Sequence, residues 1–253
     1  MTAGSAALDV VEFAVAELES CGLYVAGKGS APNTAGFVEL DASIMHGPSR
    51  AAGAVAAVVD VVNPISVARS VMEHTSHVML AGSGALNFAR ERGCALVEDA
   101  SSYYVLPVGV TAEDVSEQKH GTVGAVALDS AGELAAATST GGTFMKLEGR
   151  VGDTPLIGPG TWADSNIAVS FTGTGEHIIR SGGAIAVALA YRSGASLEAA
   201  AASVLDEIKR LGGDAGLIAV TRDAMVAMPY NSDGMKRAAA GSDLPLTVAT
   251  FAN

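Results

Sequence analysis

Residues 120–142 read HGTVGAVALDSAGELAAATSTGG, and they predict a hairpin at the centre of the molecule. From 123 to 128 the run is apolar at odd and even positions alike, which is typical of a strand covered on both faces. Residues 129–132 carry turn-forming side chains, and 133–138 predict a second strand that returns beside the first. Polar residues crowd the end of that second strand, which a purely structural hairpin does not explain.

The rest of the chain predicts strand pairs and helix pairs rather than strict strand–helix alternation. The spacing of apolar residues predicts helices at 7–20, 49–60, 65–74, 85–92, 177–192 and 197–211. Strands are expected at 37–45, 77–81, 167–171, 217–221 and 224–229, and residues 107–120 are the best linker candidate. Because like elements come in blocks, we predict the α+β class, with helices layered outside antiparallel sheets.

Composition excludes several classes of protein. Of the 253 residues, 27 are acidic and 15 are basic, and the resulting net charge of −12 argues against a nucleic-acid partner. Apolar residues make up 49%, but no unbroken run is long enough to predict a membrane span, and no secretory signal is visible. Cys21 and Cys94 form no CxxC pair, so free thiols in a cytoplasmic protein are expected.

Two other motifs resemble binding sites but lack a residue that the site would need. Gly82-Ser83-Gly84 lies between an expected strand and an expected helix, but Asn87 stands where a dinucleotide-binding fingerprint needs its third glycine. His74 and His77 are three residues apart, and no third ligand is signalled, so no metal site is predicted.

Thr122 offers more specific chemistry. A threonine hydroxyl is a weak nucleophile unless a neighbouring base takes its proton, and the threonine's own α-amine serves if the chain is cut before it. A free α-amine has a pKa of about 7.7 to 8, close to the pH at which a general base works best. Gly121 suits such a cut because a residue without Cβ tolerates a strained peptide and leaves its carbonyl open to attack.

The motifs around Thr122 are specific, and together they run through nearly the whole chain in register. They are GTVGAVALD at 121–129, LAAATSTGG at 134–142, GRVGDTPLIG at 149–158, TGTGE at 172–176 and NSDGM at 231–235, with AGKGS at 26–30 and ELDASIM at 39–45 upstream. The chain therefore resembles the plant-type (type III) L-asparaginases, also called isoaspartyl aminopeptidases. These are N-terminal-nucleophile (Ntn) hydrolases with a threonine nucleophile.

The resemblance implies a fold and a catalytic set. The fold would be a four-layer αββα sandwich in one domain, 1–253, which self-cleavage between Gly121 and Thr122 divides into an α-subunit segment, 1–121, and a β-subunit segment, 122–253. Thr122 would be the nucleophile, Thr140 would hydrogen-bond its hydroxyl, and an oxyanion hole would be formed by the Thr172 hydroxyl and the Gly173 N–H.

The resemblance also implies how a substrate is held. Arg150 would bind the substrate α-carboxylate, while Asp153 and the Gly175 carbonyl would bind its α-ammonium group. These two clamps fit isoaspartyl dipeptides and L-asparagine, which would pass through an aspartyl-threonine ester. The family pairs as dimers of precursors, so we expect an (αβ)₂ assembly after cleavage.

Departures from the family pattern leave alternatives open. The family's usual first strand precedes the helix expected at 7–20 and is not seen, so we expect that core strand to be absent or the start to be alternative or truncated. Val25 replaces the usual Asn and His46 the usual Asp. The loop at 19–27, which often binds sodium through backbone carbonyls, is altered, so we predict no cofactor and leave the ion as an alternative. A relative retuned to another small amide, or a non-processing relative acting as a binding or assembly protein, remains the alternative function.

Overall fold

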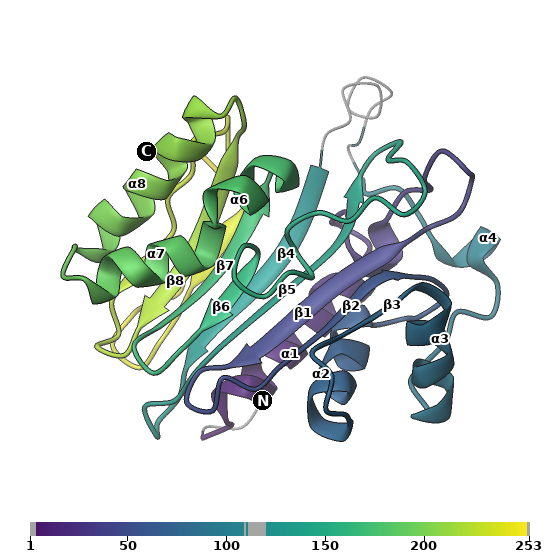
Figure 1. Cartoon of the computed structure of the whole chain (residues 1–253), viewed down its shortest axis with the longest axis horizontal. Helices are drawn as coiled ribbons and strands as arrows, with labels where there is room; N and C mark the ends of the chain where they lie inside the picture. The colour runs from purple at the N-terminus through teal and green to yellow at the C-terminus, as the bar shows by residue number, and fades with distance from the viewer. Residues whose placement is uncertain (1–3, 109, 111–119, 252–253) are drawn as a thin grey trace.

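The structure is a computed structural model that describes residues 4–108, 110 and 120–251 (Figure 1). It contains two main β-sheets with helices packed outside them, so the predicted mixed class with two sheets is confirmed. Most of the expected linker at 107–120 lies outside the described residues. No helix in the described ranges is long and apolar enough to cross a membrane.

The larger sheet has five strands in the order β3-β2-β1-β5-β4. All neighbours are antiparallel except β2 and β3, which run parallel. Its strands are β1 (Leu40–His46), β2 (Ala52–Val58), β3 (Met79–Ala81), β4 (His120–Leu128) and β5 (Leu134–Thr143). The predicted central hairpin is therefore confirmed as β4 and β5, and β5 also pairs with β1.

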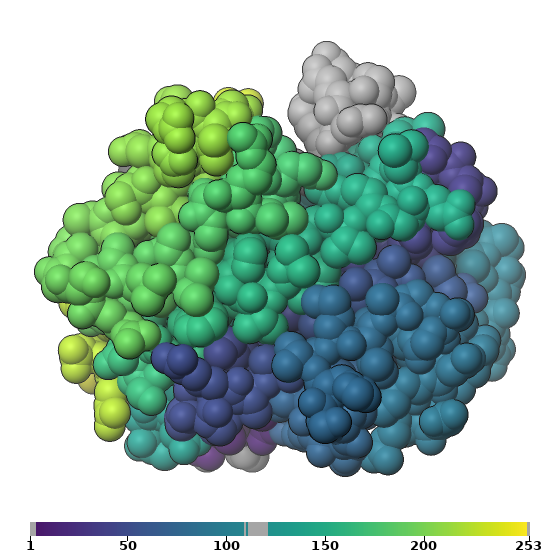
Figure 2. All heavy atoms as spheres, viewed as in Figure 1, coloured from purple at the N-terminus to yellow at the C-terminus, as the bar shows by residue number. Residues whose placement is uncertain are grey.

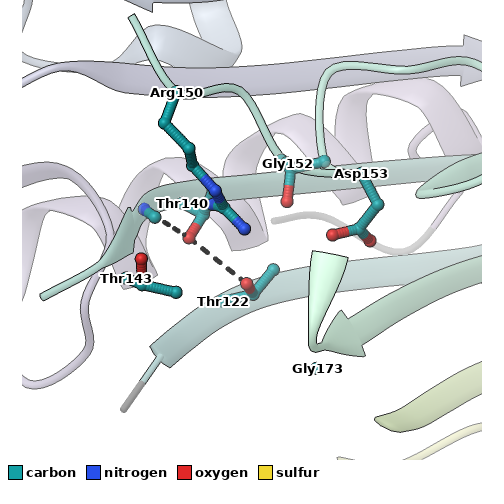
Figure 3. A pocket seen from close by; sticks show the side chains of 9 residues that line it. Thr122, Thr140, Thr143, Arg150, Gly152, Asp153 and Gly173 are labelled. Carbon is teal, nitrogen blue, oxygen red and sulfur yellow. Dashed lines mark hydrogen bonds between the residues drawn. The ribbon is translucent and has the colours of Figure 1, made fainter. Parts of the chain in front are cut away.

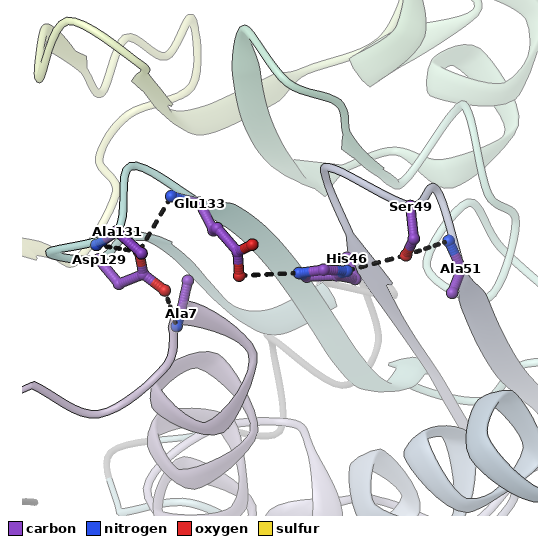
Figure 4. A network of polar contacts seen from close by, with 7 residues as sticks. All are labelled: Ala7, His46, Ser49, Ala51, Asp129, Ala131 and Glu133. Atoms are coloured by element: carbon purple, nitrogen blue, oxygen red, sulfur yellow. Dashed lines mark hydrogen bonds and ion pairs between the residues drawn. The ribbon is translucent and has the colours of Figure 1, made fainter.

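The turn of this hairpin is built on one carboxylate (Figure 4). Asp129 Oδ1 accepts the backbone N–H groups of Ala131 and Glu133, both at 2.9 Å. Its second oxygen accepts the N–H of Ala7 at 2.9 Å, which ties the start of the first helix to the hairpin. The expected turn chemistry thus also fixes a tertiary contact.

The second sheet has the order β6-β7-β8-β9, and its neighbours are antiparallel. Its strands are β6 (Thr161–Ala163), β7 (Ile167–Gly173), β8 (Ala215–Thr221) and β9 (Val226–Ala227), and a separate pair joins β10 (Arg237–Ala239) to β11 (Thr247–Ala249). The two main sheets face each other across one apolar cluster, formed by Met45, Leu134, Ala136, Ala163, Ala168 and Val220.

Helices cover the outer face of each sheet (Figure 1). The larger sheet carries α1 (Ala7–Ser20), α2 (Pro64–His74) and α3 (Gly82–Glu91), and the smaller one α6 (Gly175–Ser181), α7 (Gly183–Arg192) and α8 (Leu197–Arg210). Two short helices, η1 (Gly27–Gly29) and α4 (Ala100–Tyr103), lie in connecting segments. In Figure 2 the teal-green segment after β5 crosses the front of the molecule, between the larger sheet with its helices and the smaller sheet with its helices.

Three expected elements differ in the structure. The helix expected at 49–60 is wrong, because Ala52–Val58 forms strand β2. Its Ala-rich run suits either state, and pairing with β1 on one side and β3 on the other decides for the strand. The helix expected at 177–192 is broken into α6 and α7 at Gly182 and Gly183, both of which have positive φ. The third, β3, covers only Met79–Ala81 of the strand expected at 77–81 and lies partly exposed at the sheet edge.

Candidate active site

The two threonines of the central hairpin face each other across the β4–β5 ladder. Thr122 pairs with Thr140 in register, so both side chains lie on the same face of the sheet. Thr122 Oγ1 donates a hydrogen bond to Thr140 Oγ1 at 3.2 Å, and the Gly142 N–H donates to the same oxygen at 2.9 Å (Figure 3). The expected contact between these hydroxyls is therefore present.

Thr140 also contacts the peptide bond that precedes Thr122. Its hydroxyl donates to the carbonyl oxygen of Gly121 at 2.7 Å. The β4–β5 register shifts between His120 and Thr122, so Gly121 sits at an irregularity of the ladder. Such irregularities re-aim side chains and occur often beside active sites. The Thr122 hydroxyl and the Gly121 carbonyl thus share one hydrogen-bonding neighbour.

Gly121 has little room for a side chain. A Cβ built there would lie 3.0 Å from both Cβ and Cγ2 of Val25. Val25 is itself buried, and its carbonyl accepts the Gly141 N–H at 2.8 Å. The residue that departs from the family pattern therefore packs directly against Gly121.

The loop after β5 brings Arg150 to a small pocket beside the two threonines, called the hollow below (Figure 3). The hollow is lined by Thr122, Thr140, Gly142, Thr143, Arg150, Gly152, Asp153, Thr154 and Gly173. The loop is anchored by Glu39, whose Oε1 accepts the Gly149 N–H at 2.9 Å and whose carbonyl accepts Lys146 Nζ at 2.9 Å. The Arg150 side chain is 17% exposed and forms a bidentate ion pair with Glu176. Glu176 is the last residue of the TGTGE motif, and nothing in the sequence signals its contact with Arg150.

Asp153 follows on the same loop and is buried. Its Oδ2 has no hydrogen-bond partner among the described residues, and burial raises the pKa of this carboxyl to about 7. The next residue anchors it, since the Thr154 carbonyl accepts the Ser43 hydroxyl at 2.6 Å. A buried carboxylate without a partner is costly, so this one suits a cationic ligand.

Gly175 lies between the two charged groups. A Cβ built on it would lie 2.9 Å from Asp153 Oδ1 and 3.1 Å from Arg150 Nη2. The structure therefore brings Arg150, Asp153 and Gly175 together, although they come from a loop and from the first turn of α6.

The residues expected to form the oxyanion hole lie at the end of β7. Gly173 lines the hollow, and its φ of +142° and the nearby Asp214 carbonyl leave no place for a side chain. Thr172 directly precedes it in β7, paired with Gly216, and is not among the lining residues. Sequence reasoning missed four lining residues, which are recognisable only as neighbours of predicted ones: Gly142, Thr143, Gly152 and Thr154.

Buried charged side chains lie beside the Thr122–Thr140 pair, and the sequence did not signal them as a group. Asp41 pairs with Thr140 across the β1–β5 ladder, so Asp41, Thr140 and Thr122 form one row over three strands. Burial raises the pKa of the Asp41 carboxyl and lowers that of the Lys146 ammonium group. This row places a second buried carboxyl one strand away from the threonine pair.

Two observations bear on cation binding. The described residues contain no group of three or more His, Cys, Asp or Glu side chains that could hold a metal ion. In the loop at 19–27 the carbonyls of Tyr24 and Val25 already accept backbone N–H groups. Those two oxygens are therefore engaged within the protein.

Comparison with known proteins places these residues in context. A family model described as Asparaginase matches residues 1–248. The chain is 46% identical to the isoaspartyl peptidase of Escherichia coli (strain K12), over 94% of this chain and 80% of that protein. It is 40% identical to the probable isoaspartyl peptidase/L-asparaginase 2 of Arabidopsis thaliana, over 97% and 86%. The human isoaspartyl peptidase/L-asparaginase is 41% identical, over 94% and 80%.

Proposed function

The chain belongs to the asparaginase family, and on this basis we propose that the hollow at Thr122 is the active site of a self-cleaving threonine hydrolase. The chain is a hydrolase of the isoaspartyl peptidase/L-asparaginase type. The two facing sheets with helices outside them support a four-layer αββα sandwich of the Ntn-hydrolase type.

Self-cleavage is the first reaction. The Thr122 hydroxyl attacks the Gly121 carbonyl carbon, the Gly121–Thr122 amide bond breaks, and the hydroxyl proton ends on the freed amine. Water then hydrolyses the resulting ester, which leaves a Gly121 carboxylate and a Thr122 amine. The 2.7 Å contact from the Thr140 hydroxyl to the Gly121 carbonyl supports this step, because it stabilises charge that develops on that oxygen. The products are segments 1–121 and 122–253.

Turnover uses the same hydroxyl. Thr122 attacks the side-chain amide carbonyl of the substrate, and its own amine takes the hydroxyl proton and passes it to the leaving ammonia or peptide amine. The Gly173 N–H and the Thr172 hydroxyl stabilise the tetrahedral oxyanion. Water, activated by the same amine, hydrolyses the aspartyl-threonine ester and frees Thr122.

Two clamps select the aspartyl group. Arg150 binds the α-carboxylate, for which a planar guanidinium is well suited. Asp153, helped by the Gly175 carbonyl, binds the α-ammonium group, and the unpartnered Asp153 oxygen supports this role. The substrates are isoaspartyl dipeptides and L-asparagine. We further propose a cytoplasmic homodimer of precursors, which becomes (αβ)₂ after cleavage.

The chain of hydrogen bonds from Thr122 through Thr140 to the Gly121 carbonyl carries this proposal. Incubation of the purified precursor should yield two fragments, one beginning at Thr122 by N-terminal sequencing. Thr122→Ala should stay intact, and Thr140→Val should cleave about 10-fold to 100-fold more slowly, because a hydrogen bond to the developing charge is lost.

The matched control is Thr143→Val, the same change at another residue that lines the hollow. It should cleave at close to the wild-type rate. The cleaved enzyme should hydrolyse β-Asp-Leu and L-asparagine but not a simple amide without an aspartyl group. An intact wild-type chain with no hydrolysis of either aspartyl substrate would refute the proposal.

A further inference from the structure

We infer that Glu176 is a positioning residue for substrate recognition: it holds one edge of the Arg150 guanidinium so that the other edge stays open to the substrate carboxylate. The inference rests on the proposed role of Arg150, and it adds a residue to which no role was assigned. Glu176 does not have to touch the substrate, because it acts through Arg150.

The contact uses a defined part of the guanidinium. Arg150 Nε donates to Glu176 Oε1 and Arg150 Nη2 donates to Oε2, both at 2.9 Å. An arginine has five N–H donors in a fixed fork, so this side-on pair leaves both hydrogens of Nη1 and one of Nη2. No acceptor for Nη1 is found in the described part of the chain. A second carboxylate can therefore bind end-on while Glu176 stays in place.

Two glycines confine the same guanidinium. A Cβ on Gly152 would lie 2.9 Å from Arg150 Nη1 and 3.3 Å from Cζ, and a Cβ on Gly175 would lie 3.1 Å from Nη2. Backbone therefore approaches the guanidinium at both positions, which limits how far it can rotate. Glu176 directly follows Gly175 in the first turn of α6, so one short segment, 173–176, sets both the expected oxyanion donor and the orientation of Arg150.

Without Glu176, the Arg150 guanidinium would have another carboxylate within reach in the hollow, that of Asp153. Asp153 Oδ1 and Arg150 Nη2 both lie about 3 Å from the same point beside Gly175, and Asp153 Oδ2 is unpartnered. An Arg150 released from Glu176 would turn towards this buried carboxylate, since a buried unpaired charge is strongly disfavoured. An ion pair between Arg150 and Asp153 would leave neither side chain free to bind the substrate, so both the carboxylate-binding and the ammonium-binding groups would be lost. Glu176 keeps them apart, and its hydrogen bonds from Arg150 hold the pKa of its carboxyl below the ordinary value, which keeps it ionised.

The test compares Glu176→Gln and Glu176→Ala with wild type on two substrates. L-Asparagine carries the α-carboxylate, whereas L-asparaginamide has a neutral amide in its place. We expect KM for L-asparagine to rise about 10-fold in Glu176→Gln and further in Glu176→Ala, with kcat within about twofold, since the lost interaction serves binding. For L-asparaginamide, kcat/KM should change less than about twofold, because that substrate never uses the open edge of Arg150.

The matched control is Glu207→Gln, which removes a bidentate partner from Arg210 on the exposed surface of α8. It should leave both substrates unaffected. Self-cleavage at Gly121 provides the check on folding, and it should proceed normally in both Glu176 variants because their contacts lie outside the Thr122–Thr140 hydrogen bonds.

Three results overturn the inference while wild type remains active: an unchanged KM for L-asparagine, an equal loss on both substrates, or a lower KM. A lower KM would mean that Glu176 competes with the substrate for Arg150. A wild-type enzyme that hydrolyses neither aspartyl amides nor isoaspartyl dipeptides refutes the proposed function itself, and the inference falls with it.

Discussion

The buried carboxyl of Asp153 should make substrate binding depend on pH. Its pKa is raised to about 7 by burial, so in the free enzyme the carboxyl is protonated below that pH and ionised above it. Only the ionised form attracts the substrate ammonium group. KM for L-asparagine should therefore be constant above about pH 8 and rise about 10-fold per pH unit below pH 7.

Steady-state kinetics between about pH 5.5 and 8.5 would measure this dependence. The effect on KM is separable from the Thr122 amine, with its pKa of about 7.7 to 8, because that group governs kcat. Asp153→Asn should have a raised KM at every pH with no acidic limb. A wild-type KM that stays flat down to pH 5.5 would contradict the ammonium-binding role.

At the scale of elements, helix α1 is joined to helix α2 by a buried glutamate. Glu19, in the last turn of α1, accepts the Ile65 N–H at 3.0 Å with Oε1 and the Asn63 amide at 3.0 Å with Oε2. Since α2 begins at Pro64, this carboxyl caps its N-terminus from another helix. Burial nevertheless raises the pKa of Glu19 to about 8, because the loss of hydration outweighs these hydrogen bonds.

The sign of the resulting stability change follows from linkage. Between pH 4.5 and about 8 the folded state keeps a proton on Glu19 that the unfolded state has lost. The free energy of unfolding should therefore fall as pH rises through this window, by at most about 1.4 kcal/mol per pH unit. Glu19→Gln should flatten that dependence in urea titrations of the uncleaved Thr122→Ala chain.

The matched control for this change is Glu17→Gln, on the exposed face of the same helix. Because Glu19 is unchanged in this variant, its free energy of unfolding should depend on pH as it does in the Thr122→Ala chain. If Glu19→Gln and Glu17→Gln show the same slope of unfolding free energy against pH, the buried carboxyl is not the group that titrates.

At the scale of the whole molecule, the proposed cut falls inside one continuous sheet. Strands β1, β2 and β3 belong to segment 1–121, and β4 and β5 belong to 122–253 except for the first two residues of β4. The β1–β5 ladder joins the two segments from Asp41–Thr140 to His46–Ala135, and one apolar cluster draws buried residues from both. The fragments should therefore remain together after cleavage.

Size-exclusion chromatography of the cleaved protein should give a single native peak that contains both fragments, and these should separate only in denaturant. Buried strand pairing and a shared core together resist dissociation. Elution of the two fragments in separate native peaks would contradict a common sheet across the cleavage point.

Several features of this molecule could be read from the residues alone, and they are local. Apolar residues at odd and even positions and the turn at 129–132 predicted β4 and β5. The hairpin returns the end of β5 beside the start of β4, and the family resemblance named Thr140 there as the partner of Thr122. The helical spacing also predicted α1 and α8 at nearly their observed bounds. Such features depend on neighbours within one hairpin or one helix, so the periodicity of side chains determines them.

Other features were decided only by tertiary packing. The alanine-rich run at 52–58 suits a helix or a strand, and a place between β1 and β3 made it a strand. Arg150 and Glu176 lie 26 residues apart and meet because the loop after β5 and the start of α6 converge on the same end of the two sheets. Burial, which raises the pKa of Asp153, likewise depends on layers that come from distant parts of the chain. Thus the sequence by itself determined the hairpin that carries Thr122 and Thr140, through the two-residue period of its strands, and the family resemblance named Arg150 and Asp153 as further site residues. Only the tertiary structure decided that Glu176 pairs with Arg150 and that Asp41 and Asp153 are buried near the threonine pair, because their proximity arises from the packing of segments with no local pattern in common.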